Sequence, residues 1–144
     1  MKGASYCDTS VLVALTTGLH PHRELVIEAL GLTPHLHISL HGAAEYFATI
    51  TKVRLPYAVD PGQARTRVDD LLRSSDLEVV GMTLQSYRRA LTLAAKVPLP
   101  SGGVYDALHL ACAEAAVCRR LYTLNGKDFL RMAGDTDVEI VALR

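Results

Sequence analysis

The segment at residues 105–116 restricts the possible folds of this 144-residue chain more than any other stretch. It reads Tyr-Asp-Ala-Leu-His-Leu-Ala-Cys-Ala-Glu-Ala-Ala, which is typical of a helix with apolar side chains on nearly every side. A helix of this kind belongs in the interior of a protein. The early carboxylate of this segment, Asp106, is costly there unless another group pairs with it. Gly102 and Gly103 come just before and allow the backbone to approach closely.

Segments with strand character alternate with segments of helical character. The pattern predicts strands at residues 4–7, 36–38, 77–80, 121–124 and 138–141. It predicts helices at residues 11–17, 20–30, 40–52 and 127–132, in the segment 105–116, after Asp60-Pro61, and after a cap at Thr83. This alternation favours right-handed crossovers and a parallel sheet covered on both faces. No repeat or linker suggests a second domain, so residues 1–144 are interpreted as one domain.

Composition narrows the possible classes of protein. Hydrophobic residues make up 49% of the chain, which excludes a disordered protein. Lysine and arginine number 15, as do the acids, so no global positive field points to nucleic acid, although a local patch suffices. Three cysteines fit a reduced cytosolic protein better than a disulfide scaffold. No apolar run reaches about 18 residues. We therefore expect a cytoplasmic protein with no membrane partner.

Four acidic side chains are candidates for a shared site, and each also has a plainer interpretation. Asp8 follows the first strand, where open α/β sheets bind ligands, but it can equally cap the next helix. Glu45 lies within a helix and is open to interpretation as an ordinary solvated or paired residue. Asp106 would gain about 0.3–1 kcal/mol from the helix dipole alone. Asp128 suits the first turn of a late helix, and Asn125 in the same loop is a rival oxygen ligand.

The argument for a site rests on the set. Three of the four acids follow predicted strands or lie in the first turn of a helix. Carboxylates gathered in a cleft repel one another and raise each other's pKa unless a cation is present. Oxygen ligands favour Mg²⁺ or Mn²⁺, and such a site suits phosphoryl chemistry because the metal can activate water and polarise a phosphate. The sequence thus predicts a divalent metal site formed by Asp8, Glu45, Asp106 and Asp128.

Four motifs occur in a fixed order along nearly the whole chain. They are Cys-Asp-Thr-Ser-Val-Leu, Ala-Ala-Glu-Tyr-Phe, Tyr-Asp-Ala-Leu-His-Leu-Ala-Cys-Ala and Leu-Tyr-Thr-Leu-Asn-Gly-Lys-Asp-Phe. This pattern resembles the PIN-domain nucleases, and most closely the VapC toxins of bacterial toxin–antitoxin pairs. The resemblance implies a three-layer α/β/α PIN-like fold with a parallel sheet of about five strands. It also implies an endoribonuclease that depends on Mg²⁺ or Mn²⁺ and hydrolyses RNA by a metal-activated water.

The resemblance also implies roles for particular residues and partners. Asp8, Glu45 and Asp106 match the three best-defined acidic positions. Asp128 matches the fourth, although some relatives carry an Asp at the position of Asn125. Hydroxyl positions that orient these carboxylates correspond to Thr9, Ser10 and Thr123. Toxins of this kind usually form homodimers, and a small antitoxin on a separate chain covers the acidic cleft with its tail.

Several other interpretations compete with this one. Basic residues flanking the acidic segments, which could contact phosphates or be merely solvated, are Lys52, Arg54, Lys127 and Arg131. Zinc binding by histidines would involve His20, His22, His35, His37 and His41, but no HExxH or CxxC motif accompanies them. His109 is interpreted as a packing or hydrogen-bonding residue, and Cys7 as a buried inert thiol.

Two other functional classes compete with a metal-dependent nuclease. A haloacid-dehalogenase phosphatase would need an Asp two residues after Asp8, where this chain has Ser10. A catalytically silent PIN-like module that binds RNA or protein would have no reason to keep an intact acidic set. The sequence leaves open the RNA target and whether the site holds one metal or two.

Overall fold

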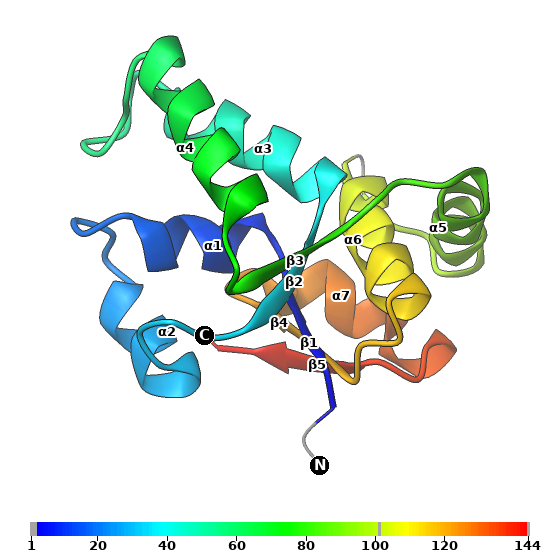
Figure 1. Ribbon diagram of the computed structural model, residues 1–144. Coiled ribbons are helices and arrows are strands. Elements are labelled where there is room, and N and C mark those ends of the chain that lie inside the picture. Colours follow the sequence, from blue (N-terminus) through cyan, green and yellow to red (C-terminus); the bar gives the residue numbers. More distant parts are fainter. Residues whose placement is uncertain (1–2, 101, 144) are drawn as a thin grey trace.

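The computed structural model describes residues 3–100 and 102–143, and a five-stranded parallel sheet lies at its centre (Figure 1). The strands run in the order β3-β2-β1-β4-β5, and all four neighbouring pairs are parallel. Their bounds are Ser5–Cys7 for β1, Leu36–Ser39 for β2, Leu77–Val80 for β3, Arg120–Thr123 for β4 and Glu139–Ala142 for β5. The prediction of a parallel sheet of about five strands is confirmed.

Helices cover the sheet on both faces, as predicted (Figure 1). One face is covered by α1 (Thr9–Thr16), α2 (Arg23–Leu30), α3 (Leu40–Ile50) and α4 (Pro61–Arg73). The other face is covered by α5 (Leu84–Lys96), α6 (Gly103–Ala115) and α7 (Gly126–Met132), with a short 3₁₀ turn at Ala133–Asp135. Side chains alternate along β1, so Tyr6 packs into the α5–α7 layer and Cys7 into the α1–α4 layer. The fold is therefore the expected three-layer arrangement.

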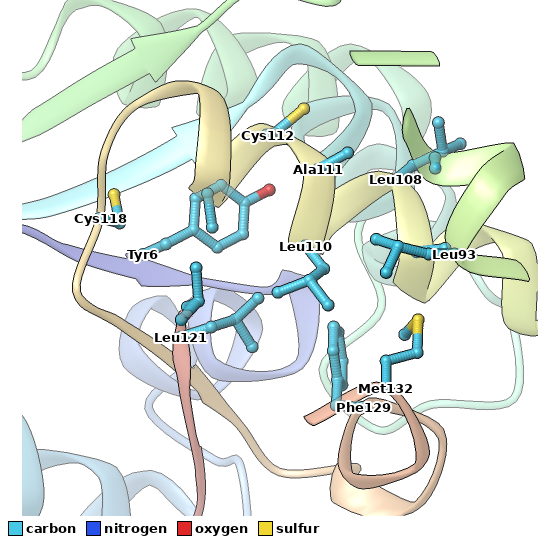
Figure 2. Close-up of a cluster of buried hydrophobic side chains, with 14 residues drawn as sticks. Tyr6, Leu93, Leu108, Leu110, Ala111, Cys112, Cys118, Leu121, Phe129 and Met132 are labelled. Carbon is cyan, nitrogen blue, oxygen red and sulfur yellow. The ribbon is translucent and has the colours of Figure 1, made fainter. Parts of the chain in front are cut away.

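Helix α6 forms the centre of one hydrophobic core, which confirms the prediction of an interior helix. Every residue from Ala107 to Ala113 is buried. Figure 2 shows several of them packed with Tyr6, Leu121 and Phe129. The helix begins after Gly102, which has φ of 89°. A Cβ at Gly103 would lie 2.6 Å from Cβ of Leu99, so glycine permits the predicted close approach.

Polar side chains cap the N-termini of several helices at the positions that the sequence predicts. Ser39 accepts a hydrogen bond from the backbone of Gly42 at the start of α3, and Thr83 accepts one from Ser86 at the start of α5. Asp60 caps α4. Because the strands are parallel, the segments that follow β1, β2 and β4 all leave the sheet at its carboxyl edge. This edge is where the candidate site must form.

The prediction that helix α2 starts at His20 is wrong by three residues. The backbone N–H of His22 donates to Nδ1 of His20, and the backbone N–H of Arg23 donates to the carbonyl of His20. These bonds hold residues 20–22 in a turn, and the helix begins only at Arg23. Helix α3 likewise ends at Ile50, two residues earlier than predicted.

The cysteines and the membrane prediction can also be compared with the structure. All three cysteines are free and buried. Burial, with a smaller effect from Asp8, raises the pKa of the Cys7 thiol well above its usual value, so this thiol is inert as expected. Among the described residues, no helix has the length and apolar character needed to span a lipid bilayer.

Candidate functional site

Asp8 occupies the gap between β1 and α1, and its side chain is only 5% exposed. Its Oδ1 accepts hydrogen bonds from the backbone of Val11 at 3.2 Å and from the Ser10 hydroxyl at 2.6 Å. Its Oδ2 accepts one from the Thr123 hydroxyl at 2.7 Å. Burial raises the pKa of Asp8, while the nearby His109 and these donors oppose the rise. Asp8 is thus an N-cap, and two side-chain hydroxyls also hold its carboxylate in one orientation.

Glu45 reaches the same edge of the sheet from helix α3 and is about one-third exposed, at 33%. Its Oε1 accepts hydrogen bonds from the Thr9 hydroxyl at 2.9 Å and from Nε2 of His109 at 2.5 Å. Nε2 of His41 lies 3.4 Å from the same oxygen. Burial alone would raise the pKa of Glu45, but the contacts with the two histidines and Thr9 hold it below its usual value. All these contacts use Oε1, so Oε2 is the oxygen available to a further ligand.

His109 connects Glu45 to the sheet. It is buried on α6, and its Nδ1 lies 2.7 Å from the Tyr6 hydroxyl on β1. That hydroxyl donates to Oγ of Ser39 at 2.8 Å. Because a carboxylate can only accept, the short contact with Glu45 requires a hydrogen on Nε2 of His109. A buried chain of polar groups from β2, β1 and α6 therefore fixes the orientation of the Glu45 carboxylate.

Asp106 lies in the first turn of α6 and is half-buried. Its pKa is raised to about 7, chiefly by burial and then by the negative charges of Asp8, Asp128 and Glu45, with His109 acting in the opposite direction. The charges of Asp8, Asp128 and Glu45 each act on Asp106, so the four predicted acids lie near one another. Among the described residues, however, no three of these carboxylates have oxygens within 4.8 Å of one another. The helix dipole alone does not compensate this carboxylate.

Asp128 lies in the first turn of α7. Its Oδ1 is buried and has no hydrogen-bond partner within the described residues. Its Oδ2 lies 3.4 Å from the position that a Cβ on Gly103 would occupy, so the carboxylate lies against the start of α6. The rival ligand, Asn125, is exposed, and its backbone N–H donates to the Thr123 hydroxyl. An orphaned buried oxygen at Asp128 is the kind of atom that a cation would satisfy.

The three hydroxyl residues singled out by the resemblance all touch a carboxylate. Ser10 and Thr123 donate to Asp8, and Thr9 donates to Glu45. The four basic side chains proposed as phosphate contacts are all exposed and make no ion pair within the described part of the chain: Lys52, Arg54, Lys127 and Arg131. They are thus free to meet an anion, although exposure alone does not assign them a role.

The interpretation of His109 as a packing or hydrogen-bonding residue is confirmed, but sequence reasoning did not predict that His109 and His41 both contact Glu45. His41, Glu45 and His109 each offer a ligand atom, and these atoms lie within 4.8 Å of one another. Nε2 of His41 is buried without a hydrogen-bond partner, and its ring stacks on Tyr105 with centroids 5.8 Å apart. Burial and then His109 lower the pKa of His41. The spacing of His41 and Glu45 by four residues on one helix was the available signal.

The other histidines considered as zinc ligands lie elsewhere. His20 and His22 form a pair in the turn before α2, with ring centroids 5.8 Å apart. His35 and His37 form another pair at β2, where Nε2 of His35 lies 3.8 Å from Glu78. Within residues 3–100 and 102–143, the cluster at Glu45 is the one group of three potential metal ligands.

The fold and this site define a class of protein. The PIN domain family profile matches residues 5–135 of the chain. The chain therefore belongs to the PIN domain family. Ribonuclease VapC40 of Mycobacterium tuberculosis is 30% identical over 114 residues, which cover 79% of this chain and 81% of that protein. The resemblance seen in the four motifs is confirmed.

Solved structures with the same fold include toxins of toxin–antitoxin systems. VapC20 of Mycobacterium tuberculosis, described as a sarcin-ricin loop cleaving toxin, superimposes with a TM-score of 0.73 at 16% identity, covering 94% of this chain and 99% of that one. A toxin–antitoxin complex from Klebsiella pneumoniae gives a TM-score of 0.64 at 24% identity, with 98% of both chains covered. At these identities the likeness establishes the fold alone.

Proposed function

We propose that this protein is the endoribonuclease toxin of a toxin–antitoxin pair and hydrolyses RNA phosphodiester bonds with the help of Mg²⁺ or Mn²⁺. The proposal includes a separate small antitoxin, a homodimer, a cytoplasmic location and a single domain over residues 1–144. Membership of the PIN domain family and the ribonuclease relative support it, since nucleases of this family generally use divalent metal. The observation that carries the proposal is that three acids, Asp8, Glu45 and Asp128, lie near enough to Asp106 to raise its pKa.

The donor set fits a hard divalent cation. In the metal-free state Asp106 has a pKa of about 7, raised by burial and by three neighbouring carboxylates. Asp128 keeps a buried oxygen without a partner, and Glu45 has Oε2 available. A cation held by Asp8, Glu45, Asp106 and Asp128 would neutralise this repulsion. Carboxylate ligands suit either Mg²⁺ or Mn²⁺, and both ring nitrogens of His109 are already engaged by Glu45 and Tyr6.

When bound, the cation supplies Lewis-acid chemistry, which lowers the pKa of a water molecule and polarises the phosphate. The chain's own residues do the rest. Ser10 and Thr123 hold Asp8, while Thr9 and His109 hold Glu45, so that both carboxylates present fixed oxygens. With a pKa of about 7, Asp106 is only partly ionised at neutral pH, and a bound cation would favour its charged form. Exposed lysine and arginine side chains would contact the negatively charged phosphates of the RNA.

Incubation of the purified protein with total cellular RNA tests this proposal. We expect discrete cuts with Mn²⁺, which mapping of the new ends locates, and no cuts with EDTA. The Asp106→Asn variant should fold, because it removes a negative charge that is unfavourable without the ion. It should fail to cut RNA, because a proposed metal ligand is lost. Retention of RNA without cleavage in Mn²⁺ would instead support a silent binding module, and cleavage by Asp106→Asn at the wild-type rate would refute the site assignment.

A further inference from the structure

A cavity of about 280 Å³ opens next to the carboxylates, and no part of the proposed metal site accounts for it. Its lining comes from the start of α1, the turn before α2, the end of α3, the loop between α3 and α4, and the segment between β4 and α7. Figure 1 shows where these helices and strands lie. Thr9 and Ser10 form the wall that it shares with the acidic site, because the same hydroxyls donate to Glu45 and Asp8. A molecule bound against this wall would therefore lie next to the residues that hold Asp8 and Glu45.

Aromatic rings line the outer part of this cavity. The His20 and Tyr57 rings have centroids 5.5 Å apart with an angle of 41° between their planes, and His22 lies beside His20. Nδ1 of His20 accepts a hydrogen bond from the backbone of His22. This bond favours a neutral ring whose Nε2–H remains a donor. The wall thus offers flat ring surface together with a hydrogen-bond donor.

The charge of the cavity differs from that of its neighbour. Lys52 lines it, and no carboxylate does so among the described residues. The amide of Asn125 adds both a donor and an acceptor. Lys52 would repel a cationic peptide, and no carboxylate among the described lining residues could pair with that peptide. A planar heterocycle joined to a phosphate would instead find aromatic rings for the heterocycle and a positive charge for the phosphate. The volume lies near the lower end of the roughly 300–1,000 Å³ of ligand pockets, which suits about one nucleotide.

We infer that this cavity binds one nucleotide of single-stranded RNA directly beside the phosphate that is cut, with its base against Tyr57 and His20 and a phosphate near Lys52. The inference rests on the proposed function, because it gives the RNA a fixed position relative to the carboxylates. Base stacking on aromatic side chains tolerates any base, whereas Asn125 and His20 provide hydrogen bonds that discriminate between base edges. These residues then set which nucleotide flanks the cut.

Photocrosslinking tests the position of the base independently of cleavage. The probe is a pool of single-stranded RNAs of about eight nucleotides that contain 5-iodouridine, mixed with the full chain in EDTA and, separately, in Ca²⁺. After irradiation, mass spectrometry should place the crosslink on Tyr57 or His20. Crosslinks confined to other residues, or none in either condition, would overturn the inference.

Binding measurements with matched variants test the contacts. Fluorescence anisotropy with the same RNAs should show Tyr57→Leu binding about 5- to 30-fold more weakly, while Tyr57→Phe, which keeps the ring, stays close to wild type. Lys52→Gln should weaken binding and reduce the slope of log affinity against log salt by about 1. Tyr87→Leu and Arg88→Gln are the controls, since both residues are exposed on α5 in the opposite layer.

The outcomes separate this inference from the proposed function. If wild type cuts RNA in Mn²⁺ but the cavity variants bind RNA no more weakly than the α5 controls, the inference fails and the nuclease proposal stands. The cavity would then be left for a protein partner. If RNA crosslinks to Tyr57 but is never cut, the nuclease proposal fails and the nucleotide site stands. Melting temperatures of all variants show whether Tyr57→Leu is folded, and the crosslink on wild type does not depend on that variant.

Discussion

Helix α6 carries two half-buried carboxylates whose surroundings differ sharply. Near its end, Glu114 receives a bidentate pair of hydrogen bonds from Arg89 at 2.8 and 3.0 Å and a third from the Thr136 hydroxyl at 2.8 Å. Near its beginning, Asp106 faces three other acids, and its pKa is raised to about 7 by burial and by those charges. The chain pairs the first carboxylate directly with an arginine, whereas it offsets the second only in part, through His109. A folded protein tolerates an incompletely offset carboxylate most readily where a bound cation supplies the missing positive charge.

Substitution of each acid by its amide should have opposite consequences for catalysis. We expect Asp106→Asn to lower the rate of Mn²⁺-dependent RNA cleavage by at least about 10²–10³-fold, because one of the carboxylates proposed to hold the metal ion is lost. Glu114→Gln should leave the rate nearly unchanged, because its partners lie at the other end of the helix. Initial rates on one labelled RNA provide the comparison. Equal losses in the two variants would mean that the difference between the two ends is only structural.

Removal of the polar chain behind Glu45 should have the next largest effect. His109→Leu keeps apolar volume but loses the contacts with Glu45 and Tyr6, and we expect Mn²⁺ affinity or activity to fall about 10- to 100-fold. His109→Gln can still donate to Glu45 and should recover part of the loss. The Mn²⁺ concentration that gives half-maximal cleavage is the measurement. A merely structural role would leave that concentration unchanged while lowering the melting temperature.

The stability of the metal-free protein should depend on pH through Asp106. Its folded pKa of about 7 is above the ordinary aspartate value of 3.8, so its contribution to stability is full below about pH 4 and is lost as pH rises through 7. In EDTA, Asp106→Asn should therefore melt roughly 3–6 °C higher than wild type at pH 8, after discounting for partial exposure. The difference should disappear near pH 4. Calorimetry at several pH values tests this, and a constant difference would contradict it.

The smallest expected effect concerns the end of α6 where Arg89 pairs with Glu114. Arg89→Gln leaves Glu114 with only Thr136 as a side-chain partner, and we expect a loss of about 1 kcal/mol, since the pair is partly exposed. The double variant Arg89→Gln/Glu114→Gln should recover most of this loss. Chemical denaturation of the two variants and wild type measures it. Failure of the second substitution to restore stability would show that Arg89 acts mainly through its bond to the carbonyl of Asp135.

Local patterns were enough to predict the fold. The apolar helix α6, the caps at Ser39 and Thr83 and the alternation of strands with helices each depend on neighbouring residues, and the structure contains all of them. The four acids could be grouped because parallel strands end at one edge of the sheet. The start of α2 was mispredicted because the side chain of His20 competes for a backbone N–H, which no periodicity reveals.

The rest of the site depends on contacts between distant parts of the chain. Tyr6 and His109 are separated by 103 positions, and nothing in either motif predicts that they meet. Likewise, His20 and Tyr57 come from two different loops, so the cavity beside the acids exists only after both loops have packed. Sequence reasoning could name the carboxylates, but it could not see which side chains fix them in place.

The layers of the fold divide the four acids into two pairs. Asp8 and Glu45 belong to the half of the chain that precedes the loop at residues 51–60, while Asp106 and Asp128 belong to the half that follows it. Each half contributes only two of the four proposed ligands. A bound ion would thus link side chains from the two helical layers. A protease that cut this loop and let the two pieces separate would destroy the binding site for the ion.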